Sequence, residues 1–105
     1  MTDNLTNAQE EFIEHTDDKD VLCAIVTNMH YANNTDVTYK LPRHYTTDQL
    51  IDFFNHLNFD YNPGYGSQYL SGTIWYTDGT WSTRAEYDGK EWWKHHACPL
   101  IPTDL

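Results

Sequence analysis

The fold is decided by residues 72–96, which read GTIWYTDGTWSTRAEYDGKEWWKHH. Two dipeptides, Asp78-Gly79 and Asp88-Gly89, interrupt segments in which apolar and polar side chains alternate. Asp-Gly pairs favour two-residue hairpin turns, because these turns need a positive φ at both central positions. Alternation with a period of two is typical of strands that bury one face. The stretch therefore predicts a three-stranded antiparallel meander, with strands at about 73–77, 80–87 and 90–96.

The register of this meander assigns its side chains to two faces. If both turns have two residues, one face carries the side chains that we expect to meet a helix: Ile74, Tyr76, Trp81, Ala85 and Trp92. The other face then carries Trp75, Arg84, Trp93 and His95. A one-residue bulge at either turn would exchange the faces of a strand and change this assignment.

The second of these faces is a candidate binding surface, because it is polar and yet holds two indoles. Trp and Arg dominate the hot spots of protein interfaces, so we predict that a partner binds at Trp75, Arg84, Trp93 and His95. A structural alternative has Arg84 stacked on Trp93 as a cation–π pair, with Trp75 covered by the amino-terminal segment.

Two helices are predicted outside the meander. Thr46 and Gln49 form a capping box that begins a helix over 46–58, in which four apolar residues recur at helical spacing. These residues are Leu50, Phe53, Phe54 and Leu57. Thr6 and Gln9 repeat the capping-box pattern, which predicts a short helix near the amino end.

The whole chain fits a single α+β domain. Its 105 residues suffice for one compact unit, residues 1–105, and 15% aromatic content supplies large side chains for the core. β-branched content favours a strand at 21–31, and alternation favours another at 37–41, with turn residues between them. We therefore expect this hairpin and the meander to form an antiparallel sheet against the 46–58 helix. Pro99 and Pro102 predict an extended tail over 97–105.

The charge of the chain is strongly negative and uneven. Sixteen acids against six bases give a formal net charge of -10, and residues 1–20 form an acidic segment. Nucleic acids and anionic membranes are bound through Lys and Arg, so we expect a protein partner with a basic surface. On a helix, Glu10, Glu14, Asp17 and Asp18 would share one face, where carboxylates about 5.4 Å apart would imitate duplex phosphates. A solvated segment that aids solubility is the alternative.

No sequence motif identifies a reaction. The chain contains no nucleophile elbow, phosphate loop, dinucleotide fingerprint or metalloprotease helix, so we expect no catalytic residue and no cofactor. His95, His96 and Cys98 carry donors that suit zinc, but neighbouring residues of a strand point to opposite faces, so we expect no metal site. The meander register also places two carboxylates, Glu86 and Glu91, opposite each other.

The sequence favours a cytoplasmic location. It shows no secretion signal, and its longest apolar run, Val21–Val26, is too short to cross a bilayer. We accordingly expect Cys23 and Cys98 to be reduced thiols.

The segments 72–81, 84–93 and 95–99 together resemble the carboxy-terminal motif of small proteins of tailed bacteriophages. The resemblance implies a phage source and no catalytic residue. By analogy with small acidic phage proteins, it implies a non-catalytic inhibitor of a host protein in the host-cell cytoplasm. The target would be a restriction, CRISPR or transcription enzyme, blocked by nucleic-acid mimicry. The alternatives are a small-ligand-binding module that uses exposed tryptophans and a virion-associated structural protein. The oligomeric state stays open.

Overall fold

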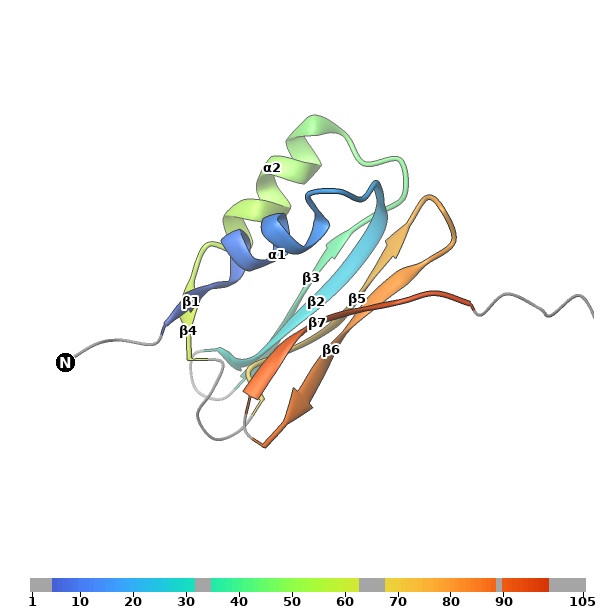
Figure 1. The fold of residues 1–105 in the computed structure, drawn as a ribbon. Coiled ribbons are helices and arrows are strands. Elements are labelled where there is room, and N and C mark those ends of the chain that lie inside the picture. Colours follow the sequence, from blue (N-terminus) through green and yellow to red (C-terminus); the bar gives the residue numbers. More distant parts are fainter. Residues whose placement is uncertain (1–4, 32–34, 63–67, 89, 99–105) are drawn as a thin grey trace, which may run out of the picture.

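The two helices in the described part of the chain lie on one face of a five-stranded antiparallel sheet (Figure 1). The computed structural model describes residues 5–31, 35–62, 68–88 and 90–98. Its elements, in chain order, are β1 (Thr6–Asn7), α1 (Ala8–Thr16), β2 (Val21–Tyr31), β3 (Thr35–Leu41), α2 (Thr47–His56), β4 (Asp60–Tyr61), β5 (Leu70–Tyr76), β6 (Trp81–Tyr87) and β7 (Lys90–His96). The predicted α+β fold is confirmed.

The predicted hairpin and the predicted meander form a single sheet, because β2 pairs with both β3 and β5. The strand order is β3-β2-β5-β6-β7, and Ala24 of β2 lies between Leu41 of β3 and Ile74 of β5. β5 begins at Leu70, before the predicted start of that strand. The turn predicted between β2 and β3 falls partly outside the described residues.

The register between β5 and β6 differs from the prediction by one residue. Trp75 pairs with Trp81, Ile74 pairs with Ser82, and the Tyr76 amide donates to the Thr80 carbonyl at 3.0 Å. The loop inside this last pair, residues 77–79, therefore has three residues instead of two. Gly79 ends this loop with φ +87, which glycine adopts without steric penalty. The one-residue shift exchanges the faces of β6 and β7 relative to β5.

The register between β6 and β7 follows the prediction. Arg84 pairs with Trp93, and Ala85 pairs with Trp92. Asp88 has φ +54, as expected for the first central position of a two-residue hairpin turn.

The exchanged faces correct the predicted orientation of five residues. Arg84 and Trp93 were expected at the surface, but both face the helices and their side chains are buried, with Trp93 only 6% exposed. Trp81, Ala85 and Trp92 were expected to meet a helix, but alternation along the strands puts them on the opposite face. We call this helix-free side the open face of the sheet.

The two helices confirm one predicted cap and correct the other. At α2 the capping box forms as predicted, because Thr46 accepts from the Gln49 amide and Gln49 accepts from the Thr46 amide. At α1 the capping residue is Asn7, which accepts from the Glu10 amide, and not Thr6. Thr6 and Asn7 instead form β1, which pairs with β4.

The core lies where the two helices meet the sheet. Phe12 of α1 is its centre, with its ring edge-on to Phe53 at 5.4 Å, to Phe54 at 5.9 Å and to Trp93 at 6.0 Å. Such edge-to-face pairs add about 0.5–1.5 kcal/mol each beyond the area they bury. Each helix in the described part of the chain is too short or too polar to cross a membrane. Most of the predicted tail, residues 99–105, lies outside the described residues.

Candidate functional site

Arg84 lies at the centre of a buried ionic cluster between β6 and the helices. Its side chain is only 1% exposed. Its Nη2 atom donates to Glu91 Oε1 at 2.6 Å and to the Tyr61 hydroxyl at 2.9 Å. Its Nη1 atom lies 3.1 Å from Glu11 Oε1, and its guanidinium stacks 5.1 Å from the Trp93 ring. This stacking is the structural alternative that the sequence had left open for Arg84 and Trp93.

The partners of Arg84 are themselves held in place. Glu91 accepts from the backbone amides of Tyr69 at 2.6 Å and Leu70 at 3.0 Å, and Tyr61 donates to Glu11. Burial raises the pKa of the Tyr61 phenol well above its ordinary value. Burial lowers the pKa of Arg84, but Glu11 and the other partners outweigh it and raise that pKa overall. The buried ionic cluster therefore holds Arg84 in a fixed position, and Arg84 is not available to a partner protein.

Glu86 and Glu91 pair across β6 and β7 as the sequence predicts, but their side chains have different surroundings. Glu86 is exposed, whereas Glu91 is buried with Arg84 and two backbone amides. The opposite charge of Arg84 thus compensates Glu91.

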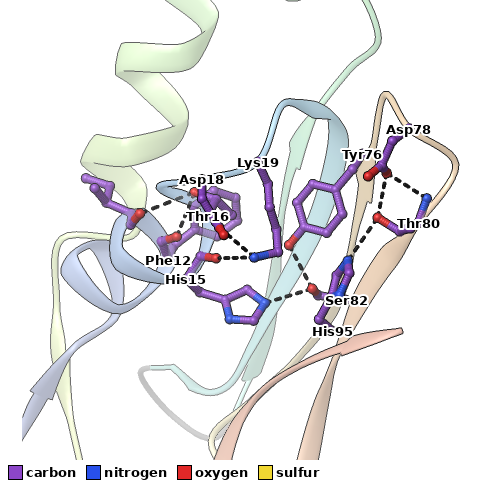
Figure 2. A network of polar contacts seen from close by, with 11 residues as sticks. Phe12, His15, Thr16, Asp18, Lys19, Tyr76, Asp78, Thr80, Ser82 and His95 are labelled. Atoms are coloured by element: carbon purple, nitrogen blue, oxygen red, sulfur yellow. Dashed lines mark hydrogen bonds and ion pairs between the residues drawn. The ribbon is translucent and has the colours of Figure 1, made fainter. Parts of the chain in front are cut away.

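A second polar network joins α1 to the sheet (Figure 2). His15 Nε2 lies 2.7 Å from Ser82 Oγ, and Ser82 Oγ lies 2.7 Å from the Tyr76 hydroxyl. Lys19 reaches the carbonyl of His15 at 3.4 Å and pairs with Asp18 at 2.7 Å. The side-chain hydroxyls of Ser82 and Tyr76 therefore both have hydrogen-bond partners, although both residues are buried away from water.

The contact between Ser82 and His15 has the composition of a nucleophile and its base. Ser82 is 0% exposed, however, so a substrate could not reach its hydroxyl in this conformation. The contact instead connects α1 to β5 and β6. The arrangement gives no support to an enzymatic role for these residues.

The environment of His15 makes the stability of the fold dependent on pH. Burial lowers the pKa of His15 below its ordinary value of 6.5, and the charges of Lys19, His95 and Arg84 act in the same direction, opposed by Asp18. The unfolded chain therefore takes up the proton first. The contribution of His15 to stability is complete above pH 6.5. It is lost as the pH falls from 6.5 to the lower pKa of His15 in the folded state.

We expect His15→Gln to remove this part of the pH dependence, because Gln does not titrate. The measurement is urea unfolding of the wild type and H15Q at several pH values between about 7.5 and 5. The free energy of unfolding should fall more steeply for the wild type as the pH decreases. Parallel curves for the two proteins would show that His15 does not cause the dependence.

The acidic residues predicted to share a helical face are exposed on α1 and the turn after it. Glu10 and Glu14 lie on the helix, which ends at Thr16, so Asp17 and Asp18 lie just beyond it. Asp18 is paired with Lys19, and this contact lowers the pKa of its carboxyl. The structure therefore brings Glu10 and Glu14 together on one helix and leaves Asp18 partly neutralised.

A hollow of about 340 Å³ lies between α1 and the edge strand β7. It is lined by Glu11, Glu14, His15, Trp92 and Trp93. Trp93 is held rigidly, because His15 stacks on it at 6.3 Å and Arg84 contacts it at 5.1 Å. Trp92, which the strand register places on the open face, borders the hollow at the edge of the sheet and is 40% exposed. The hollow thus combines carboxylates with indole surface, which suits a cationic side chain.

The two other predicted surface residues lie apart from this hollow. Trp75 is 38% exposed on the open face of the sheet, next to Trp81. His95 is exposed near the end of β7, where its Nε2 lies 2.9 Å from Thr80 Oγ1. His96 stacks on Trp81 on the open face, so the neighbouring histidines do point to opposite faces. In the described ranges, no three His, Cys, Asp or Glu side chains gather as metal ligands.

Sequence reasoning missed Glu11 and Trp92 as members of the candidate site. Trp92 was assigned to the buried face because the loop before β6 was counted one residue too short. Glu11 follows Glu10 directly and gave no signal of its own, since its role depends on Arg84, far away in the sequence.

No protein-family model, curated protein or solved structure matches the chain.

Proposed function

We propose that this chain is a non-catalytic protein that binds a basic surface of another protein. The hollow between α1 and β7 carries the proposal, because Glu14 and the half-exposed Trp92 both line it. A Lys or Arg side chain of the partner pairs there with the carboxylate while its cation contacts the indole. Trp and charged residues that surround a preformed hollow are typical of binding hot spots.

The formal charges around the hollow favour a cation. Arg84 is the only base of the buried cluster among the described residues, and it faces two carboxylates, Glu11 and Glu91. The cluster therefore keeps a formal charge of about -1, to which Glu14 adds another negative charge. An approaching cation meets net negative potential in spite of the buried guanidinium.

The acidic residues on the helices also favour binding of a basic partner on this side of the molecule. The helix side carries exposed acids on both helices, among them Glu10, Glu14, Asp48 and Asp52 (Figure 1). Negative potential around the helices increases the rate at which a basic partner associates and orients the encounter.

The sharper form of the proposal is competition with nucleic acid on a host protein. Glu10 and Glu14 lie about one helical turn apart, so they present charges at a spacing near that of duplex phosphates. In the phage setting that the sequence resemblance implies, the partner is a restriction, CRISPR or transcription protein in the host cytoplasm. Its nucleic-acid cleft supplies the basic surface.

The hollow is tested with an arginine-rich peptide as a defined basic probe. We expect the peptide to change the tryptophan fluorescence, and we expect E14Q/W92A to weaken binding at least about tenfold, as for a hot-spot residue. The matched control D52N/W75A also removes one carboxylate and one half-exposed indole, but outside the hollow. Equal weakening by both variants would contradict the proposed site.

Competition with nucleic acid is tested on host proteins captured from a lysate. Partner capture should decrease strongly between low and high salt, and duplex DNA should displace the protein from its partner. A captured partner that has no basic cleft, or that DNA leaves bound, would contradict the mimicry.

A further inference from the structure

Several bases in the described part of the chain make no ion pair, and two of them, Lys40 and Lys94, lie on strands with their side chains on the open face. Of the six bases in the chain, Arg84 is buried with carboxylates and Lys19 is paired with Asp18. Within the ranges that the structure covers, Lys40, Arg43, Lys90 and Lys94 make no ion pair. Their positive charges are therefore not cancelled by a neighbouring carboxylate and can attract an anion.

Two of these cations line a cavity of about 230 Å³ on the open face. Lys40 and Arg43 line it together with apolar residues, among them Ile25, Pro42 and Trp75. Its described lining contains no carboxylate. The cavity thus combines an exposed aromatic surface with two positive charges.

The cavity lies at one end of an aromatic row that crosses the sheet. Cys23 pairs with Trp75, Trp75 pairs with Trp81, and Trp81 pairs with His96, so these side chains share the open face. The His96 ring stacks on Trp81 at 5.7 Å. Flat antiparallel sheets with aromatic side chains on an open face suit the stacking of bases.

We propose that this cavity binds a nucleotide, with its base stacked on Trp75 and its phosphate held by Lys40 and Arg43. Charge complementarity selects this ligand over a neutral sugar, because the two cations match a phosphate and the indole matches a base. The cavity shares no lining residue with the hollow at α1. Nucleotide binding therefore does not depend on the residues proposed to bind a basic protein.

The nucleotide comes either from the free pool or from a single strand, and a titration distinguishes these sources. The probes are a mononucleotide, the same nucleoside without phosphate, and a single-stranded oligonucleotide, followed by tryptophan fluorescence at low salt. We expect the mononucleotide to bind more tightly than the nucleoside. An equal affinity for the oligonucleotide identifies a free nucleotide, and a higher affinity that also depends on Lys94 identifies a strand.

The matched variants decide whether the cavity is the site. K40Q/R43Q should remove the difference between nucleotide and nucleoside, and W75A should weaken nucleotide binding about tenfold, as for one stacked base. The control W92A changes another half-exposed indole and should leave mononucleotide binding unchanged. Absence of binding, equal effects of W75A and W92A, or equally tight binding of a glutamate-rich peptide would overturn the proposal. The arginine-rich peptide proposed to bind at the α1 hollow should bind K40Q/R43Q as it binds the wild type.

Discussion

Replacing Arg84 by Met is expected to lower the free energy of unfolding by about 3–5 kcal/mol, because it leaves the buried Glu91 without its cation. Glu91 is 2% exposed at its side chain and lies 2.6 Å from the guanidinium, so water cannot take the place of Arg84. Glu11 and the Tyr61 hydroxyl lose the same partner. For a domain of this size the midpoint of thermal unfolding should fall by about 15 °C or more.

Urea unfolding followed by circular dichroism measures this effect. R84K should give an intermediate loss of stability. A single ammonium keeps the charge, but it cannot contact Glu11 and Glu91 at once as the two terminal nitrogens of the planar guanidinium do. R43M is the control, since Arg43 is exposed, and it should stay within about 0.5 kcal/mol of the wild type. A loss below about 1 kcal/mol for R84M would contradict the importance of the buried ionic cluster for stability.

Replacing Gly72 by Ala is expected to disrupt the pairing of β2 with β5. Gly72 has φ +152, and a Cβ atom added there would lie 2.3 Å from the carbonyl oxygen of Ile25 and 3.0 Å from the Val26 Cα. Both contacts are with the backbone of β2, which cannot move without breaking the sheet. Strain and overpacking together should remove about 2–5 kcal/mol of stability.

The matched control for Gly72 is Gly79, in the loop between β5 and β6. Gly79 also has a positive φ, +87, but a Cβ atom there meets no other atom within 4 Å. G79A should therefore lose only the conformational term, about 1–2 kcal/mol. Hydrogen exchange of the amides of β2 and β5 in the two variants measures where the loss arises. Similar protection in G72A and the wild type would contradict close approach of the two strands.

The sequence predicts those features of the fold that depend on local chemistry. The α2 cap at Thr46 and Gln49 needs only side chains and amides within one helical turn, so it could be predicted from the sequence alone. The same holds for the β6–β7 turn, whose Asp88 adopts the positive φ that its turn type requires.

The β5–β6 register could not be predicted from its Asp-Gly pair alone. In that loop the Asp78 carboxylate accepts from the Thr80 amide at 2.9 Å and from the Thr80 hydroxyl at 2.6 Å. The second Asp-Gly pair is followed by Lys90, which has no hydroxyl. A Thr two residues after the Asp therefore distinguishes the longer loop from the shorter one.

The candidate site depended on contacts between distant segments, so the sequence indicated only part of it. Glu10 and Glu14 were predicted from their helical spacing, and both are exposed as expected. Arg84 was expected at the surface because the β5–β6 loop was counted one residue too short, and its partner Glu11 comes from the other end of the chain. Asn7 likewise caps α1 while it contacts Asn58 and Asp60 across β1 and β4.

The most direct test of the proposed function reverses one pair of acids on each helix. E10K/E14K and D48K/D52K each change a first-turn acid and the acid four residues later, on α1 and α2 respectively, so both variants change the net charge equally. The measurement is the affinity of each variant for the captured host partner. We expect E10K/E14K to weaken binding about a hundredfold and D48K/D52K by less than about threefold. Equal weakening by both pairs would show that only net charge matters and would contradict a binding site at α1.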